Sequence, residues 1–323
     1  MPLSIGLYGV NGHQIHGALA RHPDARLAAV AAFPSGLCPE APHLPSLDAL
    51  LAVPGIDLVS LCSPRRADQA ADAIRCLRAG RHVYAEKPCA MSEADLDAIL
   101  AAARASGRQF HEMAGTVVMQ PYRAAREAVR SGAVGEVVQV LTQKSYPWHE
   151  RRPDDEGIDG GLALQVGVYP MRFFEHIAGM RIASVRLEET RLGNSRPGSA
   201  CRRAVTFQAR FENGGLGAAI CNYLNPLGRR LWGYEMLRIF GTLGAVVCDL
   251  ETGRARLLRP DEPDRDLDVS SPPTVDYFDL IVASLLGRGE MPLSIEEEVR
   301  PTRWALRARG TVDSEQWTVN SGQ

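Results

Sequence analysis

One lysine stands where catalytic side chains are often found, at the end of a short apolar run, Gly80-Arg81-His82-Val83-Tyr84-Ala85-Glu86-Lys87-Pro88. Residues 82–85 predict a buried strand, and Lys87 follows its carboxyl end. Ligands in open α/β sheets bind outside the carboxyl ends of the strands. A lysine that is partly buried there can exchange a proton with a substrate hydroxyl. Lys87 is therefore a candidate for acid–base catalysis, the alternative being a solvated surface charge.

A glycine-rich turn near the N-terminus is a candidate for binding phosphate groups. Gly9 and Gly12 lie between the first predicted strand and the first predicted helix. Glycine at such a turn lets the backbone approach a pyrophosphate at a helix N-terminus. The full pattern G-x-G-x-x-G would place glycine where this chain has Asn11 and Gln14. Asparagine tolerates left-handed backbone, so Asn11 is a mild departure and Gln14 a larger one. A strand-to-helix turn without a ligand is the alternative interpretation.

The second predicted strand lacks the residue that usually distinguishes the two nicotinamide cofactors. A carboxylate at the end of this strand normally binds the adenosine ribose of NAD. The segment 29–33 has no acidic residue, and no arginine follows it directly to bind the 2′-phosphate of NADP. Ser35 is the nearest side chain that offers a hydroxyl. The choice between NAD and NADP stays open.

The first part of the chain alternates short apolar runs with amphipathic segments. The pattern predicts strands at 3–10, 26–32, 57–62 and 82–85, and helices at 13–21, 67–79 and 92–106. Ser92 is the expected N-cap of the last helix, with Asp95 completing a capping box and Gly107 ending the helix. This alternation with short links predicts an α/β fold with a doubly wound parallel sheet.

After about residue 120 the pattern changes to strands that follow one another. Helices are expected at 121–131 and 163–178, and strands at 137–144, 184–189, 203–212, 215–223, 238–240 and 245–249. Asn213-Gly214 predicts a hairpin turn. We therefore expect two domains, residues 1–118 and 119–323, the second being an α+β domain with a mostly antiparallel, open-faced sheet.

Composition excludes several classes of protein. Of the 323 residues, 45% are hydrophobic and 23% charged, and the formal net charge is −2, which predicts a globular protein that binds neither nucleic acid nor a membrane. Seven scattered cysteines fit a reducing compartment. No signal peptide and no long apolar segment are visible, so a cytoplasmic location is expected. No His, Asp and Glu set has the spacing of a metal site.

The run that ends in Glu86-Lys87-Pro88 resembles the G-K-H-V-x-x-E-K-P signature of the glucose-fructose oxidoreductase / inositol dehydrogenase (Gfo/Idh/MocA) family. Ser63-Pro64 resembles the T-P that follows its third strand. The segments 160–164 and 167–170 look like G-G-G-A-L-x-D-x-G-x-[HY], and residues 239–244 resemble I-x-G-T-x-G. The resemblance covers nearly the whole chain.

The resemblance implies a Rossmann dinucleotide-binding domain followed by a substrate-binding and oligomerisation domain. It implies that Lys87 is the catalytic lysine and that Tyr169, where many members have histidine, acts as an acid or base. Gln165 stands where the family usually has aspartate, so it keeps the hydrogen-bonding reach without the charge. Trp148 and His149 would contact the substrate. The expected contacts to NAD or NADP are Gly9, Asn11, Gly12, His13, Ser35, Ser63, Pro64, Glu86 and Lys87.

Three of these candidates have structural alternatives. Tyr169 could serve only as packing, His149 could be a solvated loop histidine, and Trp148 could cover a surface. We expect an NAD(P)-dependent oxidoreductase that transfers hydride between nicotinamide and a small carbinol or carbonyl substrate, such as a sugar, polyol or cyclic diol. The alternative is a non-catalytic nucleotide- or sugar-binding sensor or partner-binding protein of the same fold. An open-faced sheet would leave apolar surface exposed, which predicts a homodimer or homotetramer.

Overall fold

The structure is a computed structural model that describes residues 1–113, 115–228 and 231–314, with side chains through residue 310. These residues form two compact units. The first unit comprises residues 1–123, 153–161 and 269–302, and the second comprises residues 124–152, 162–268 and the chain from 303 onward. Two later segments, 153–161 and 269–302, thus belong with the N-terminal part of the chain. The predicted domain boundary after residue 118 stays a prediction.

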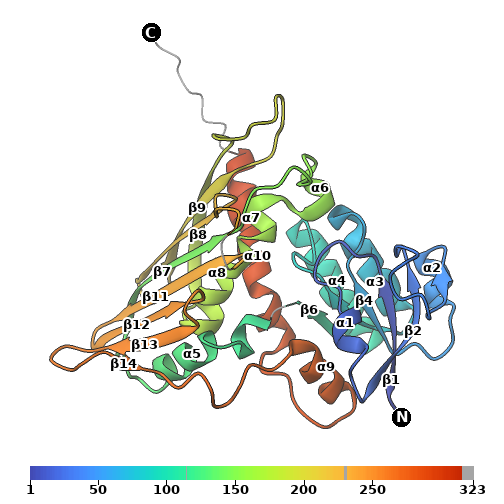
Figure 1. Ribbon diagram of the computed structural model, residues 1–323, viewed down its shortest axis with the longest axis horizontal. Helices are drawn as coiled ribbons and strands as arrows, with labels where there is room; N and C mark the ends of the chain where they lie inside the picture. Colours follow the sequence, from blue (N-terminus) through green and yellow to red (C-terminus); the bar gives the residue numbers. More distant parts are fainter. Residues whose placement is uncertain (114, 229–230, 315–323) are drawn as a thin grey trace. The chain divides into compact units, whose positions relative to one another are not determined.

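The first unit contains a parallel sheet of six strands in the order β3-β2-β1-β4-β5-β6 (Figure 1). Its strands are β1 (Leu3–Tyr8), β2 (Ala25–Ala31), β3 (His43–Leu44), β4 (Leu58–Leu61), β5 (His82–Ala85) and β6 (Phe110–Glu112). This is the strand order of a dinucleotide-binding fold, in which the direction of winding reverses between β1 and β4. The predicted doubly wound α/β architecture is confirmed.

The helices of the first unit begin and end largely where local signals place them. They are α1 (His16–Leu19), α2 (Leu47–Leu51), η1 (Arg66–Asp68), α3 (Gln69–Arg78), α4 (Glu93–Ser106), η2 (Gly115–Val118), α6 (Glu156–Asp159), α9 (Tyr277–Leu285) and the first part of α10 (Ile295–Ser314). The side chain of Ser92 accepts a hydrogen bond from the Asp95 N–H, and Gly107 has φ of 63°. The predicted caps of α4 are therefore confirmed.

The first helix is shorter than the predicted segment 13–21. The N–H of His13 donates to the Glu86 carboxylate, and the N–H of Ile15 donates to the side-chain oxygen of Gln14. Side chains thus bind the amides at 13 and 15, and regular helix begins only at His16.

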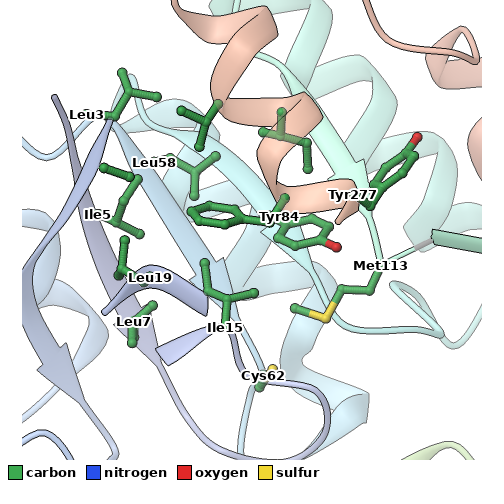
Figure 2. Close-up of a cluster of buried hydrophobic side chains, with 14 of the residues drawn as sticks. Leu3, Ile5, Leu7, Ile15, Leu19, Leu58, Cys62, Tyr84, Met113 and Tyr277 are labelled. Carbon is green, nitrogen blue, oxygen red and sulfur yellow. The ribbon is translucent and has the colours of Figure 1, made fainter. Parts of the chain in front are cut away.

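Apolar side chains from β1 form the centre of the first unit's core. Ile5 and Leu7 are fully buried, as is Leu58 on β4. Figure 2 shows these residues together with Tyr84 of β5 and Tyr277 of α9. The ring of Tyr84 stacks on that of Phe278 with a centroid distance of 6.4 Å. Packing along the whole length of β5 fixes the position of the turn that follows it.

The second unit contains a sheet of eight strands in the order β14-β13-β12-β11-β7-β10-β9-β8. The strands are β7 (Val137–Ser145), β8 (Ile182–Thr190), β9 (Ala204–Phe211), β10 (Leu216–Asn222), β11 (Tyr234–Gly241), β12 (Gly244–Asp249), β13 (Arg254–Leu258) and β14 (Arg265–Asp266). Among the described residues of this sheet, only the pairing of β7 with β10 is parallel, and the other pairings are antiparallel. The hairpin at Asn213-Gly214 joins β9 to β10, with Gly214 at φ of 88°. The mostly antiparallel sheet is confirmed.

The helices of this unit are α5 (Tyr122–Arg130), α7 (Gly161–Gln165), α8 (Val168–Arg172) and the π-helical turn η3 (Phe173–Ile177). Figure 1 shows the helices α5, α7 and α8 on one face of the eight-stranded sheet. Side chains alternate along the strands, so that Phe207 and Leu237 are buried while Ile220 and Phe240 remain 41% and 37% exposed. The sheet is therefore open on one face, as predicted.

The predicted continuous helix 163–178 is wrong, because the segment is divided into α7, α8 and η3. Gly167 lies at the break between α7 and α8, and a Cβ atom there would lie 2.0 Å from the Ala163 carbonyl oxygen and 2.5 Å from the Phe207 ring. The close approach to β9 thus requires glycine at this position, and at the break the Gly167 N–H donates to the Leu162 carbonyl, five residues earlier, at 3.3 Å. Separately, none of the described helices is long and apolar enough to cross a membrane.

Candidate active site

Lys87 follows the carboxyl end of β5, as the sequence predicts. Its side chain is 4% exposed, so it is not a solvated surface charge. The Lys87 Nζ atom lies 3.8 Å from Oε1 of the neighbouring Glu86, which is itself 1% exposed. The Lys87–Pro88 peptide bond is cis. A buried ammonium and a buried carboxylate are therefore held side by side at the edge of the parallel sheet.

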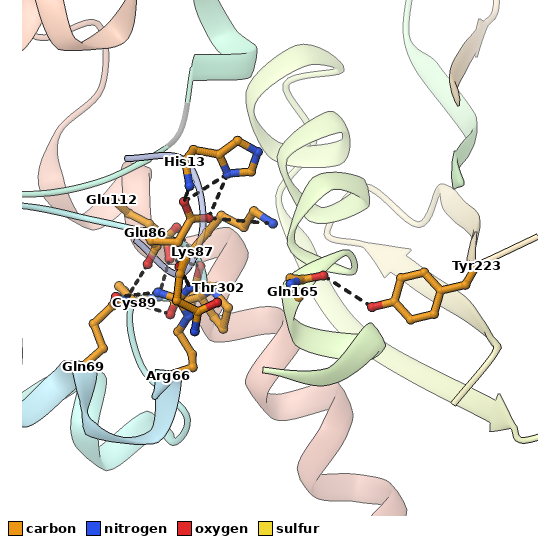
Figure 3. A network of polar contacts seen from close by, with 12 residues as sticks. His13, Arg66, Gln69, Glu86, Lys87, Cys89, Glu112, Gln165, Tyr223 and Thr302 are labelled. Atoms are coloured by element: carbon orange, nitrogen blue, oxygen red, sulfur yellow. Dashed lines mark hydrogen bonds and ion pairs between the residues drawn. The ribbon is translucent and has the colours of Figure 1, made fainter. Parts of the chain in front are cut away.

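The backbone of this turn is held by buried polar side chains of the same unit (Figure 3). Gln69 donates to the carbonyl oxygens of Glu86 at 2.6 Å and Pro88 at 3.2 Å. The N–H of Cys89 donates to Glu112 at 2.8 Å, and Thr302 donates its hydroxyl to the same carboxylate. The turn is thus fixed on both sides of Lys87, and Cys89 contributes its backbone.

A second layer of polar groups fixes Glu112. Its N–H donates to Glu298 Oε1 at 2.6 Å, while His111 and Tyr277 bind the other oxygen of Glu298 at 3.0 and 2.9 Å. This network is not among the residues predicted from the sequence. The available signal was the cluster of polar residues at the end of β6, but Glu298 lies 186 positions from Glu112.

The Glu86 side chain points into the glycine-rich turn. Its carboxylate accepts hydrogen bonds from the backbone N–H of His13 and contacts the His13 ring nitrogen at 3.0 Å. Gly12 has φ of 132°, and a Cβ atom there would lie 2.5 Å from Glu86 Oε2. Glycine at position 12 is therefore required to admit the Glu86 carboxylate, a reason that the sequence motif alone does not reveal.

Glu86 is ionised in spite of its burial. Burial by itself raises the pKa of Glu86, but the hydrogen bond from His13 and the positive charges of Lys87 and Arg66 outweigh it and lower the pKa to about 2. Arg66 is 1% exposed and donates to the Asn11 carbonyl at 2.6 Å. One buried anion is thus surrounded by three basic side chains.

The two departures from the glycine pattern have structural reasons. Gln14 donates to the Gly9 carbonyl at 2.9 Å and accepts from the Ser60 hydroxyl at 2.7 Å, so it fastens the turn to β4. The backbone of Asn11 is not left-handed, so the expectation that asparagine is tolerated here for its left-handed conformation is wrong. Gly9 and Gly12 supply the positive φ angles of this turn. Asn11 instead donates its amide to the Ile158 carbonyl at 2.5 Å.

The edge of the parallel sheet fits a dinucleotide in its strand order and in the glycine turn after β1. Ser35 is exposed beyond the end of β2, and Pro64 is exposed beyond β4. Ser63 is fully buried and donates its hydroxyl to Asp72 at 2.9 Å, so this hydroxyl serves the protein's own packing. No three described His, Cys, Asp or Glu side chains lie close enough to hold a metal ion.

Gln165 and Tyr169 lie in the second unit and are both partly exposed. All other residues of the segment 161–174 are buried. Gln165 accepts a hydrogen bond from the Tyr223 hydroxyl at 3.3 Å (Figure 3). Lys144 lies 4.4 Å from the centroid of the Tyr169 ring and pairs with the Glu235 carboxylate. Lys87 and Lys144 are the lysines of the sequence, and both are buried.

Trp148 and His149 lie in the segment after β7 and are partly buried. The Trp148 ring lies 6.3 Å from that of Tyr223, and the His149 ring lies 5.8 Å from that of Trp232. Burial and the positive charges of two arginines lower the pKa of His149, which favours its neutral form. His149 is thus partly shielded from solvent, and its contact with the substrate stays a prediction.

Comparison with known families identifies the class of protein. Residues 5–113 match the oxidoreductase family with an NAD-binding Rossmann fold, and residues 122–247 match the Gfo/Idh/MocA C-terminal domain. The chain belongs to the Gfo/Idh/MocA family of oxidoreductases, and its first unit contains an NAD-binding Rossmann domain.

Several relatives are similar to parts of the chain. A dTDP-3,4-didehydro-2,6-dideoxy-alpha-D-glucose 3-reductase of Streptomyces violaceoruber is 36% identical over 42% of this chain and 40% of its own. A myo-inositol 2-dehydrogenase of Thermotoga maritima is 23% identical over 67% of this chain and 63% of its own. The matches thus span less than two thirds of either relative. A solved oxidoreductase structure from Thermotoga maritima, 23% identical, has a TM-score of 0.87 and covers 97% of this chain and 99% of its own.

Proposed function

We propose that the protein is an NAD(P)-dependent dehydrogenase or reductase that acts on a CH–OH group of a sugar, polyol or cyclic diol. The observation that carries this proposal is the buried Lys87 at the carboxyl end of β5, fixed by the hydrogen bonds of Gln69 and Glu112. A lysine in that environment is suited to proton exchange with a substrate hydroxyl. The nicotinamide, when bound, exchanges the hydride.

The remaining proton chemistry is assigned to the second unit. Tyr169 keeps part of its surface accessible, and the cations Lys144 and Arg172 lie 4.4 and 5.8 Å from its ring centroid. Gln165 is oriented by Tyr223 and would hold a substrate hydroxyl through its amide. We assign Lys87 and Tyr169 to proton transfer and Gln165 to positioning of the substrate.

The cofactor and substrate contacts are assigned from the family resemblance and from the position of the residues in the fold. Residues of the turn after β1, of the segment after β2 and of the turns after β4 and β5 would contact the cofactor, namely Gly9, Asn11, Gly12, His13, Ser35, Ser63, Pro64, Glu86 and Lys87. Trp148 and His149 would contact the substrate. The relatives' names include a reductase of a dTDP-sugar and a dehydrogenase of myo-inositol, which supports carbohydrate or polyol substrates.

Turnover of a sugar and polyol panel with NAD or NADP tests this proposal. Lys87→Met and Tyr169→Phe should each lower kcat about a hundredfold or more, since general acid–base catalysis contributes roughly 10²–10⁴-fold. The double variant should be little slower than either single one, because groups that act as a unit lose most of their effect at the first deletion. Arg78→Met on the exposed side of α3 and Tyr234→Phe on β11 are matched controls and should retain full activity.

Two results would contradict the proposal. Activity that survives in both Lys87→Met and Tyr169→Phe would exclude the proposed acid–base pair. A wild-type protein that binds NADH but turns over no panel substrate would favour the non-catalytic sensor instead.

A further inference from the structure

Three arginines of the second unit surround aromatic rings beside Gln165. We call Arg152, Arg196 and Arg203 the arginine cluster. The guanidinium carbons of Arg203 and Arg196 lie 4.0 and 4.9 Å from the Trp148 ring centroid. That of Arg152 lies 3.5 Å from the Tyr223 ring centroid. Three like charges are therefore gathered around two adjacent aromatic side chains.

Two members of the cluster are buried and lack some of their hydrogen-bond partners. Arg152 and Arg203 are each 8% exposed. Within the described part of the chain, Arg203 Nε and Nη1 and Arg152 Nε are buried without a hydrogen-bond partner. The carboxylate of Glu150 is exposed and accepts a hydrogen bond from the Trp148 ring N–H at 3.4 Å. Buried charges are ordinarily paired, so this arrangement calls for an anion.

Arg203 does not relieve the repulsion between these like charges by losing its proton. Burial lowers the pKa of Arg203, as do the positive charges of Arg152 and Arg196. An arginine side chain nevertheless stays protonated in proteins. The repulsion between the buried guanidinium groups of Arg203 and Arg152 therefore favours the binding of a negatively charged group.

The cluster connects to the residue that we assign to substrate positioning. Arg152 stacks on the ring of Tyr223, and the Tyr223 hydroxyl donates to Gln165 at 3.3 Å. Arg203 immediately precedes β9, and its carbonyl accepts from the Tyr223 N–H at 2.9 Å. A ligand hydroxyl bound by Gln165 would thus have an anion-binding group close by, within the same unit.

We propose that the arginine cluster binds a diphosphate group of the substrate, which makes the substrate a diphosphate-linked sugar. This inference rests on the proposed function, because it assigns the substrate of that site. The planar guanidinium fork binds phosphate oxygens in pairs. A single carboxylate would compensate one charge, whereas a diphosphate offers enough charge and oxygens for several guanidinium groups at once.

Calorimetric titration of the full-length protein with inorganic pyrophosphate, in the presence of saturating NADH, tests the proposal directly. NADH occupies the dinucleotide site of the first unit, so the measured binding reports a second site. Arg203→Gln and Arg152→Gln should each weaken pyrophosphate binding about tenfold or more, because hydrogen bonds between ions are the strong ones. Arg191 is an exposed arginine in the segment between β8 and β9 that also holds Arg196 and Arg203, and Arg191→Gln should leave binding unchanged.

Arg203→Lys keeps the charge and removes the fork, and it guards against misfolding of the glutamine variants. Binding that falls in Arg203→Lys while NADH affinity stays constant supports the proposal. Pyrophosphate that fails to bind wild-type protein, or that binds wild-type and Arg203→Lys equally, overturns it.

The two proposals fail in different ways. Turnover of neutral sugars without pyrophosphate binding would refute the diphosphate site and leave the oxidoreductase function intact. Pyrophosphate binding that depends on Arg203, without any turnover, would establish the anion site and contradict the proposed reaction.

Discussion

Glu86→Gln should lower the stability of the first unit in a pH-dependent way. The folded-state pKa of Glu86 is about 2, below its ordinary value of 4.5. A carboxylate whose pKa is lowered on folding stabilises the folded state above its unfolded-state pKa, and this contribution is lost as the pH falls through the folded-state pKa. The difference corresponds to about 3 kcal/mol at neutral pH. By pH 3 about 2 kcal/mol of that contribution should be gone.

The substitution keeps the shape of the side chain and removes only the charge. Glutamine at position 86 can still accept from the His13 N–H, but it lacks the negative charge that pairs with Lys87 and is attracted by Arg66. Wild-type protein should therefore lose about 2 kcal/mol more stability between pH 7 and pH 3 than the Glu86→Gln variant does. Hydrogen exchange of the peptide that covers residues 82–90, measured along a urea titration at each pH, gives the free energy of unfolding of the first unit alone.

Glu290→Gln is the matched control, since this carboxylate is exposed in the same unit. The stability of the Glu290→Gln variant should depend on pH as the stability of the wild type does. Parallel stability curves for wild type and Glu86→Gln would refute the reasoning, because the Glu86 charge would then contribute equally to the folded and unfolded states.

Three further predictions concern the turn, the cofactor and the assembly. Gly12→Ala should destabilise the protein by about 2 kcal/mol, since the φ of 132° at Gly12 and the clash with Glu86 both oppose a Cβ atom. Thermal unfolding should show no such loss for the control Gly17→Ala, because nothing lies within 4 Å of a Cβ atom there. NAD and NADP should bind with affinities that differ by less than about a hundredfold, because residues 29–33 carry no charged ribose ligand; fluorescence titration measures both constants, and a larger preference would contradict this. The protein should be at least dimeric, because the open sheet face exposes Leu216, Ile220 and Phe240, and a monomeric mass in light scattering would refute this.

The sequence by itself determined the features that depend on neighbouring residues. The cap at Ser92, the helix stop at Gly107 and the hairpin at Asn213-Gly214 each rest on contacts within a few positions, and the structure confirms them. The position of Lys87 at the end of a strand was equally predictable, because the apolar run before it defines β5. Alternation of strands and helices then sufficed to predict the doubly wound sheet.

Tertiary structure alone decided what surrounds those residues. Gly12 is glycine because Glu86, in the turn after β5, fills the space beside it, and Glu112 is held by Glu298 from near the other end of the chain. The helix expected at 163–178 is broken at Gly167, where the close approach of Phe207 of β9 leaves no room for a Cβ atom. Arg203 lies beside Tyr223 because β9 and β10 pair in one register. Such contacts join residues far apart in sequence, and the sheet topology, which depends on the packing of the whole unit, sets which of them meet.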